Sequence, residues 1–178
     1  MSKPPAAMRS NGRPEDPHFH PDEYLFRRVP TEIWDDPGDY LGVEAVQLPD
    51  ISVGRSKYGH AEWVRFDTVN GQFYEEWGIV GVQVKDVPPK MWRDGYPRFA
   101  FRARHLPDER NYPHSEIRAY DDEKHVDMID LFPEDVHLEW RERLLRKVQT
   151  IIKPHQKVVV RDRPPASHKP EPPQQLPE

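Results

Sequence analysis

The chain has no cysteine, no long apolar run and no excess of positive charge, and each absence excludes a class of protein. Without cysteine there are no disulfide bonds, no thiolate metal ligands and no cysteine nucleophile. Acidic residues outnumber basic residues by 31 to 26, so nucleic acid is not the favoured partner. The longest apolar segment, residues 78–84, is far shorter than the roughly 20 residues of a membrane helix. We therefore expect a cytoplasmic protein with no membrane partner, since residues 1–21 also lack a signal-peptide pattern.

Several enzyme signatures are missing as well. The sequence has no glycine-rich phosphate loop, no nucleophile elbow, no zincin helix motif and no deaminase cysteine pair. Ser52 has no base at a diagnostic spacing, so a serine hydrolase is not indicated. Whether the protein is an enzyme is therefore uncertain from these motifs.

The aromatic residues and the prolines are unevenly distributed along the chain. All but one of the aromatic residues lie between Tyr24 and Trp140, whereas proline is concentrated at the two ends. The ends cannot bury enough apolar surface to offset their ordering entropy. We predict a disordered tail over residues 1–21, a single folded domain over residues 22–161 and a second disordered tail over residues 162–178.

The pattern of apolar residues predicts an α+β domain. Alternation of apolar and polar residues is typical of strands. One helix is predicted over residues 133–152, because Trp140, Leu144, Val148 and Ile151 share one helical face. Strands or extended segments are predicted at 24–29, 42–48, 60–66, 77–87, 99–104, 114–120 and 158–160, and residues 51–53 form a short apolar patch. The expected fold is a mostly antiparallel sheet of short strands packed by one long C-terminal helix.

A histidine followed two residues later by an acid occurs three times, at 60/62, 114/116 and 125/127. On a strand these two side chains share a face, so each pair can present an imidazole beside a carboxylate. Ordinary cross-strand electrostatics explains such pairs too. If the strands are neighbours, a divalent metal could be bound for a hydrolase or nuclease reaction. The predicted ligands are His105, His114, Glu116, His125 and Asp127.

The segment from residue 104 to residue 118 is rich in polar side chains and contains a predicted loop. Loops on a rigid scaffold are frequent binding sites, although a solvated turn has a similar composition. Our leading hypothesis is an accessory module without its own catalysis that binds another protein through this segment. Its predicted binding residues are Arg104, His105, Asp108, Asn111, His114, Glu116 and Arg118.

Two resemblances complete the sequence evidence. The order of the segments LFRRVP (25–30), ISV (51–53), GIVGV (78–82) and NYPHSEI (111–117) is similar to that of small uncharacterised bacterial proteins, and implies a prokaryotic intracellular origin. The succession of Arg27, Ser52 and Glu116 resembles the Arg-Ser-Glu order of ADP-ribosyltransferases, which implies NAD as a substrate. The serine–threonine neighbourhood and paired acidic motif of that family are absent here.

Overall fold

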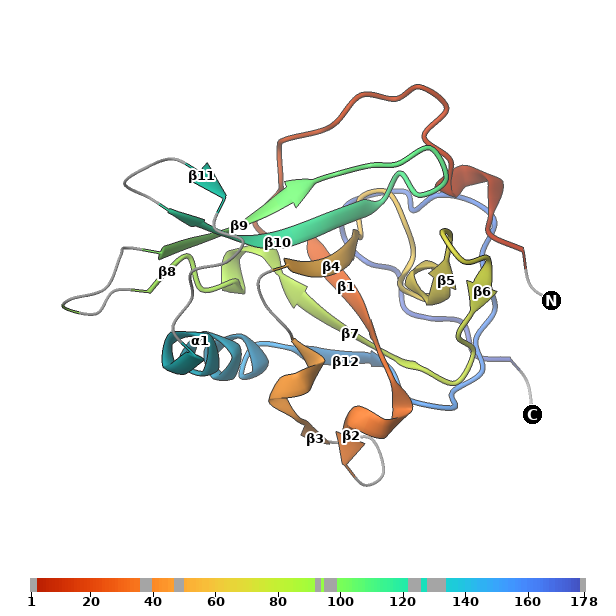
Figure 1. Ribbon diagram of the computed structural model, residues 1–178. Helices are drawn as coiled ribbons and strands as arrows, with labels where there is room; N and C mark the ends of the chain where they lie inside the picture. The colour runs from red at the N-terminus through yellow and green to blue at the C-terminus, as the bar shows by residue number, and fades with distance from the viewer. Residues whose placement is uncertain are drawn as a thin grey trace.

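A single antiparallel sheet organises the protein. In the computed structural model the described residues are 3–35, 40–46, 50–91, 94, 99–121, 126–127 and 134–176. The sheet has eight strands in the order β12-β7-β1-β4-β10-β9-β8, with β11 beside β10 (Figure 1). Every neighbouring pair is antiparallel. The strands are β1 (Tyr24–Val29), β4 (Asp50–Arg55), β7 (Gly78–Gln83), β8 (Lys90–Met91), β9 (Phe99–His105), β10 (His114–Asp121), β11 (Val126–Asp127) and β12 (Gln149–Ile152).

Shorter elements surround this sheet. Two small hairpins pair β2 (Trp34–Asp35) with β3 (Tyr40–Leu41) and β5 (Phe66–Asp67) with β6 (Gln72–Phe73). The α-helix is α1 (Glu134–Leu145). The 3-10 turns within the described residues are η1 (Ala6–Met8), η2 (Thr31–Ile33), η4 (Val43–Ala45), η5 (Ala61–Arg65) and η6 (Val84–Asp86).

The core lies mainly between one sheet face and α1. Period-two alternation sends Leu25, Ile117 and Phe101 to this face, where Trp140 and Leu144 of the helix cover them. The rings of Phe101 and Trp140 stack with their centroids 4.2 Å apart. The opposite face buries a second cluster against η5, formed by Phe26, Ala61, Ile79, Ile152 and Val158.

The predicted helix is too long. The structure confirms an α+β fold with a mostly antiparallel sheet, but α1 has 12 residues and ends at Leu145. Lys147 and Val148 donate to the carbonyls of Leu144 and Leu145 and close the helix. The following apolar residues form β12, which pairs with β7 and satisfies the backbone of that strand. No described helix is long and apolar enough to cross a membrane.

The strand predictions have mixed outcomes. The strands at 24–29, 99–104 and 114–120 are confirmed, and residues 51–53 lie within β4. The predicted strand at 77–87 is shorter, because η6 follows β7. Two predictions are wrong: η5 (Ala61–Arg65) fills most of 60–66, and η4 lies in the described part of 42–48. At 158–160 there is one bridge, Val158 to Gln175.

The two proline-rich ends, which the sequence predicts to be disordered, run across the folded domain in the structure. Figure 1 shows the N-terminal segment arching over β9 and β10, and both chain ends on the side of β5 and β6. Met8 is 1% exposed and packs with Trp63 and Phe66. Tyr112 donates its backbone N–H to the Met8 carbonyl at 2.6 Å. These segments are held by individual hydrogen bonds and single buried side chains rather than by regular secondary structure.

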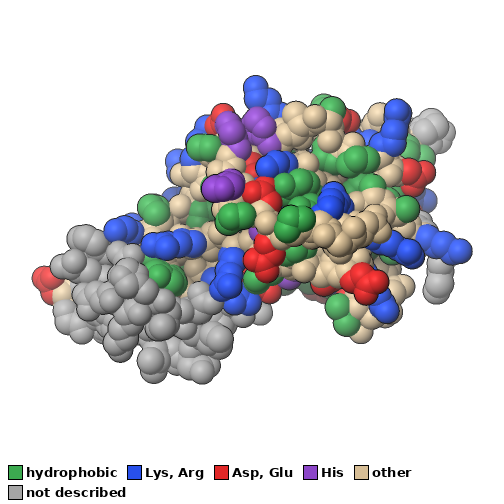
Figure 2. All heavy atoms as spheres, turned by 90° about the horizontal axis from the view of Figure 1, so that it is seen from above, with side chains coloured by type: hydrophobic (Ala, Val, Ile, Leu, Met, Phe, Trp, Pro, Cys, Tyr) green, Lys and Arg blue, Asp and Glu red, His purple; other side chains and the backbone are tan. Residues whose placement is uncertain are grey.

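The surface has a mixed charge. On the face shown in Figure 2, basic, acidic and apolar side chains are interspersed among the coloured residues. This mixture agrees with the small formal net charge of -5.

Candidate functional site

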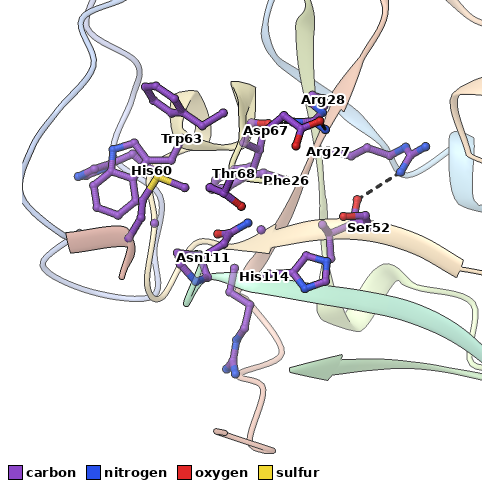
Figure 3. Close-up of a pocket in the computed structure, with 18 of the residues that line it drawn as sticks. Phe26, Arg27, Arg28, Ser52, His60, Trp63, Asp67, Thr68, Asn111 and His114 are labelled. Carbon is purple, nitrogen blue, oxygen red and sulfur yellow. Dashed lines mark hydrogen bonds and ion pairs between the residues drawn. The ribbon is translucent and has the colours of Figure 1, made fainter. Parts of the chain in front are cut away.

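A cavity of about 380 Å³ lies where β1 and β4 separate. The two strands pair only at Leu25–Arg55 and Phe26–Gly54, whereas β1 continues along β7 as far as Val29. Residues of β1, β4, η5 and the start of β10 line the space, which we call the β1–β4 cavity (Figure 3). Its wall depends on Gly54, because a Cβ there would lie 2.5 Å from Cγ1 of Val64 in η5. The absent side chain lets η5 approach the sheet and complete the wall.

Arg27 lies in this wall as a cation without an acidic partner. Its Nε donates to the Ala45 carbonyl at 2.6 Å and its Nη1 to the Ser52 carbonyl at 3.2 Å (Figure 3). No carboxylate contacts it within the part of the chain that the structure describes. Burial, together with the charge of Arg28, lowers the pKa of Arg27 to about 10. The group stays protonated at neutral pH, and three of its five N–H donors have no described protein partner.

The side chain of Arg28 leaves β1 on the face opposite to that of Arg27, and its positive charge is paired with a carboxylate. Its Nη2 lies 3.3 Å from Oδ2 of Asp67, and its guanidinium carbon lies 4.9 Å from the centroid of the Tyr74 ring. Burial alone would raise the pKa of Asp67, but hydrogen bonds from Asn70 and the charge of Arg28 lower it. Asp67 therefore compensates the charge of Arg28 only in part, since that charge still contributes to the lowered pKa of Arg27.

His114 and Glu116 lie together at the same end of the fold. Nδ1 of His114 is 2.8 Å from the Leu106 carbonyl, which can only accept, so this nitrogen carries a proton. In the neutral ring Nε2 is then the acceptor, and it lies 3.9 Å from Oε1 of Glu116. Arg118 donates to the other carboxylate oxygen at 2.6 Å. The predicted pair thus shares one face, and Glu116 is in register with Ser52 of β4.

His105 does not join this pair. Its register partner is Ser115, so the sheet separates it from His114 and Glu116, which alternate to the other face. Its Nδ1 accepts the Asp16 backbone N–H at 2.8 Å, and its Nε2 lies 2.7 Å from the Tyr112 carbonyl. Both ring nitrogens are occupied, and the residue is 2% exposed. It fastens the N-terminal segment and the 106–113 loop to β9.

Only some of the predicted metal ligands lie among the residues that the structure describes. Residues 122–125, which include His125, and the side chain of Asp127 lie outside the described residues. Among the residues that are described, no group of three or more histidine and acidic side chains could hold a metal ion. A metal site that includes His125 and Asp127 stays a prediction, but the hydrogen bonds of His105 leave it no free ligand atom.

The polar loop of the interaction hypothesis is internally bonded. Oδ1 of Asp108 accepts the backbone N–H groups of Arg110 and Asn111 at 2.7 and 2.9 Å, which closes the turn. Glu109 accepts the Ser10 N–H through its carbonyl. Arg104 and Asp108 are exposed, and Arg118 is partly exposed. Binding of another protein through this segment stays a prediction.

Some of the residues that line the cavity were not identified from the sequence. The sequence had singled out Arg27, Ser52, Asn111 and His114, whereas the contributions of η5 were missed because a strand was expected there. No sequence pattern marks Arg27 as uncompensated, since that depends on the separation of β1 and β4. The lining residues missed include Trp63, Asp67 and Thr68, whereas His60 belongs to the first predicted histidine–acid pair and Asp108 to the predicted binding residues.

His105 leads to a testable pH dependence. Burial is the main cause that lowers the pKa of His105 below its ordinary value of 6.5, so the folded state holds it neutral. As the pH falls below about 6.5, the unfolded chain takes up a proton that the folded protein refuses, and stability falls. We expect His105→Gln to reduce the loss of melting temperature between pH 7.5 and 5.5, relative to the exposed control His155→Asn. An unchanged pH dependence would contradict this role.

Comparison of the chain with protein-family models, curated protein sequences and solved structures yields no match. The structure defines the class of the protein as an α+β fold with a cavity at a break in its sheet. The chemistry of that cavity must carry the functional argument.

Proposed function

We propose that this protein binds a small organic anion in the β1–β4 cavity. The observation that carries the proposal is Arg27, a partly buried cation in the cavity wall whose described partners are two neutral carbonyls. Burying a charge is costly unless it is paired. A ligand carboxylate or phosphate would supply the missing charge and accept the remaining N–H donors bidentately.

A purely structural role explains Arg27 less well. The guanidinium does satisfy the Ser52 carbonyl at a point where β1 and β4 no longer pair. A glutamine amide could donate to one such carbonyl without the desolvation cost of a positive charge. The neighbouring Arg28 makes the charge still less favourable, as the lowered pKa of Arg27 reflects. The charge itself is therefore unexplained unless an anion binds.

The size of the cavity indicates an organic ligand. A cavity of about 380 Å³ falls in the range of about 300–1,000 Å³ that is usual for small-molecule sites. It also has room for many waters at about 30 Å³ each, which is far more than an inorganic anion fills. The ligand must therefore carry an uncharged part that occupies the rest of the space.

The proposal predicts that Arg27 governs affinity for phosphate compounds. Calorimetric titration of the full chain with ribose 5-phosphate and AMP is expected to show binding to at least one of them. Arg27→Gln is expected to weaken that binding by about 10- to 100-fold, which corresponds to the loss of a charged hydrogen bond. Arg27→Lys should retain intermediate affinity, because it keeps the charge but not the fork geometry.

The matched control is Arg143→Gln, which removes an exposed arginine of α1 whose side chain is 50% exposed. This variant should bind as the unmodified protein does. Circular dichroism of each variant checks that the fold is retained. The proposal fails if neither compound binds at millimolar concentration, or if Arg27→Gln and Arg143→Gln bind equally well.

A second candidate is an ADP-ribosyltransferase-like reaction on NAD. What supports it is the contact between Arg27 and Ser52 together with the register pairing of Ser52 with Glu116 on the adjacent strand. The three residues of the predicted Arg-Ser-Glu set thus belong to three neighbouring strands, β1, β4 and β10. Release of nicotinamide from NAD, lost in Glu116→Gln, is the expected result. An absence of nicotinamide release in the presence of candidate acceptor proteins would count against this candidate, but not against anion binding.

A further inference from the structure

We propose that the anion is the phosphate of a nucleotide, and that Asn111 recognises its base beside Phe26 and Trp63. This inference rests on the proposed function and adds the chemical class of the ligand. It depends on the end of the cavity away from Arg27, which anion binding by Arg27 does not require.

The two ends of the cavity differ in chemistry. In the view of Figure 3, Arg27, Ser52 and His114 lie at one end, whereas Trp63 and His60 lie at the other. Phe26, Thr68 and Asn111 lie between them. The first end offers the guanidinium donors of Arg27, as a phosphate requires. The remaining space must hold the uncharged part of the ligand.

The inner wall is apolar and aromatic. Phe26 and Trp63 are each 1% exposed, and they border the cavity while the rest of their surface packs in the folded core. Met8 and Phe66 extend this wall from the cluster that Trp63 shares with them. Nε1 of Trp63 donates to the Arg161 carbonyl at 2.7 Å, which fixes the ring. Because these rings are almost fully buried, they form a fixed apolar boundary of the cavity rather than open stacking platforms, and such a boundary suits the uncharged part of a ligand.

Asn111 provides the polar recognition. Its backbone is fixed by the Asp108 turn, and its carbonyl accepts the His114 N–H at 3.2 Å. Its side-chain amide makes no hydrogen bond to any residue that the structure describes, and it points into the space in Figure 3. An amide places one donor beside one acceptor, which is the arrangement that pairs with the edge of a nucleobase. An aliphatic acid would leave this amide unused.

Two neighbouring groups add to the same surface. The hydroxyl of Thr68 borders the cavity and likewise makes no hydrogen bond within the described part of the chain. Nε2 of His60 pairs with the Arg163 carbonyl at 2.9 Å, so Nδ1 is the acceptor of the neutral ring. Burial lowers the pKa of His60, which keeps that ring neutral near pH 7. Several neutral donors and acceptors therefore lie beside aromatic walls, as a base-binding subsite requires.

The test compares ligands that share a phosphate and differ in the base. We expect AMP or CMP to bind the full chain at least about tenfold more tightly than ribose 5-phosphate, in line with about 1–3 kcal/mol for a bidentate base contact. Asn111→Leu keeps the side-chain volume but removes both hydrogen-bonding groups. It should reduce the affinity for the preferred nucleotide about tenfold and leave that for ribose 5-phosphate unchanged. Gln174→Ala, which removes an exposed amide outside the cavity lining, is the control.

The possible results separate the two proposals. If ribose 5-phosphate binds as tightly as both nucleotides and Asn111→Leu has no effect, the nucleotide assignment is wrong but anion binding stands. If nothing binds, both fall. If Asn111→Leu weakens all ligands equally, Asn111 supports the fold of the cavity rather than the base, and this inference is overturned.

Discussion

Replacement of Arg55 by methionine is expected to lower the free energy of unfolding by about 3–5 kcal/mol, which is typical of breaking a buried ion pair. Arg55 and Glu23 both have side chains that are 0% exposed, and their Nε and Oε1 atoms are 2.7 Å apart. Methionine would leave the Glu23 carboxylate buried without its cation. It would also remove the donors to the Asp16 and His18 carbonyls at 2.7 and 2.6 Å, which hold the N-terminal segment.

Urea denaturation followed by circular dichroism measures this change. The double variant Arg55→Met/Glu23→Leu should recover much of the loss, because replacing a whole buried pair by apolar residues is often nearly neutral. Lys85→Met is a matched control, since its ion pair with Asp22 is exposed at 49% and 42% and should contribute little. A loss in Arg55→Met no larger than in Lys85→Met would show that the pair does not stabilise the fold.

Arg161→Met is expected to have a comparable effect at the other end of the chain. Glu62 in η5 is 0% exposed, and Arg161 holds both its carboxylate oxygens, at 2.7 and 2.8 Å. Removing this cation leaves a buried carboxylate in η5 without its counter-charge, so the free energy of unfolding should again fall by about 3–5 kcal/mol. Because the Arg161 and Arg163 carbonyls bind Trp63 and His60, the segment after residue 160 should also detach more easily.

Urea denaturation and limited proteolysis measure these two effects together. We expect Arg161→Met to be cut within residues 162–176 faster than the unmodified protein, and Arg161→Met/Glu62→Leu to regain part of the stability. Arg163→Met, whose side chain has no described ion pair, is the control. Equal stability and equal cleavage in Arg161→Met and Arg163→Met would refute a role for the pair in holding the C-terminal segment.

Whether an element was predicted correctly depends on whether its local sequence is enough to determine it. β9 and β10 were predicted correctly because alternation of apolar and polar residues indicates a strand with one buried face, whereas β1 was found from its apolar start and the proline that follows it. The same alternation failed in η5, where Ala61, Glu62 and Trp63 are all buried. Glu62 can be buried there only because Arg161, 99 residues later, supplies its counter-charge. A local pattern of apolar and polar residues cannot indicate an ion-pair partner that lies so far away in the sequence.

In the candidate site, too, some features follow from the local sequence and others follow only from the pairing of distant segments. Alternation along β10 placed His114 and Glu116 on one face, as expected from the sequence. The register of β9 against β10 put His105 on the other face, and one residue of register shift would have reversed this. Strand register depends on pairing between distant segments, so the spacing of histidines could not determine it.

By itself the sequence determined the α+β class, most of the strands that build the sheet and the absence of thiol chemistry. It also singled out Arg27, Ser52, Asn111 and His114, although for reasons of composition and resemblance. Only the tertiary structure decided that these residues border one cavity, because β1 and β4 stop pairing after Phe26. It also decided that Arg27 is a cation without an acidic partner among the described residues. The physical reason is that compensation of a buried charge depends on which chain segments meet in space, and a linear sequence does not contain that information.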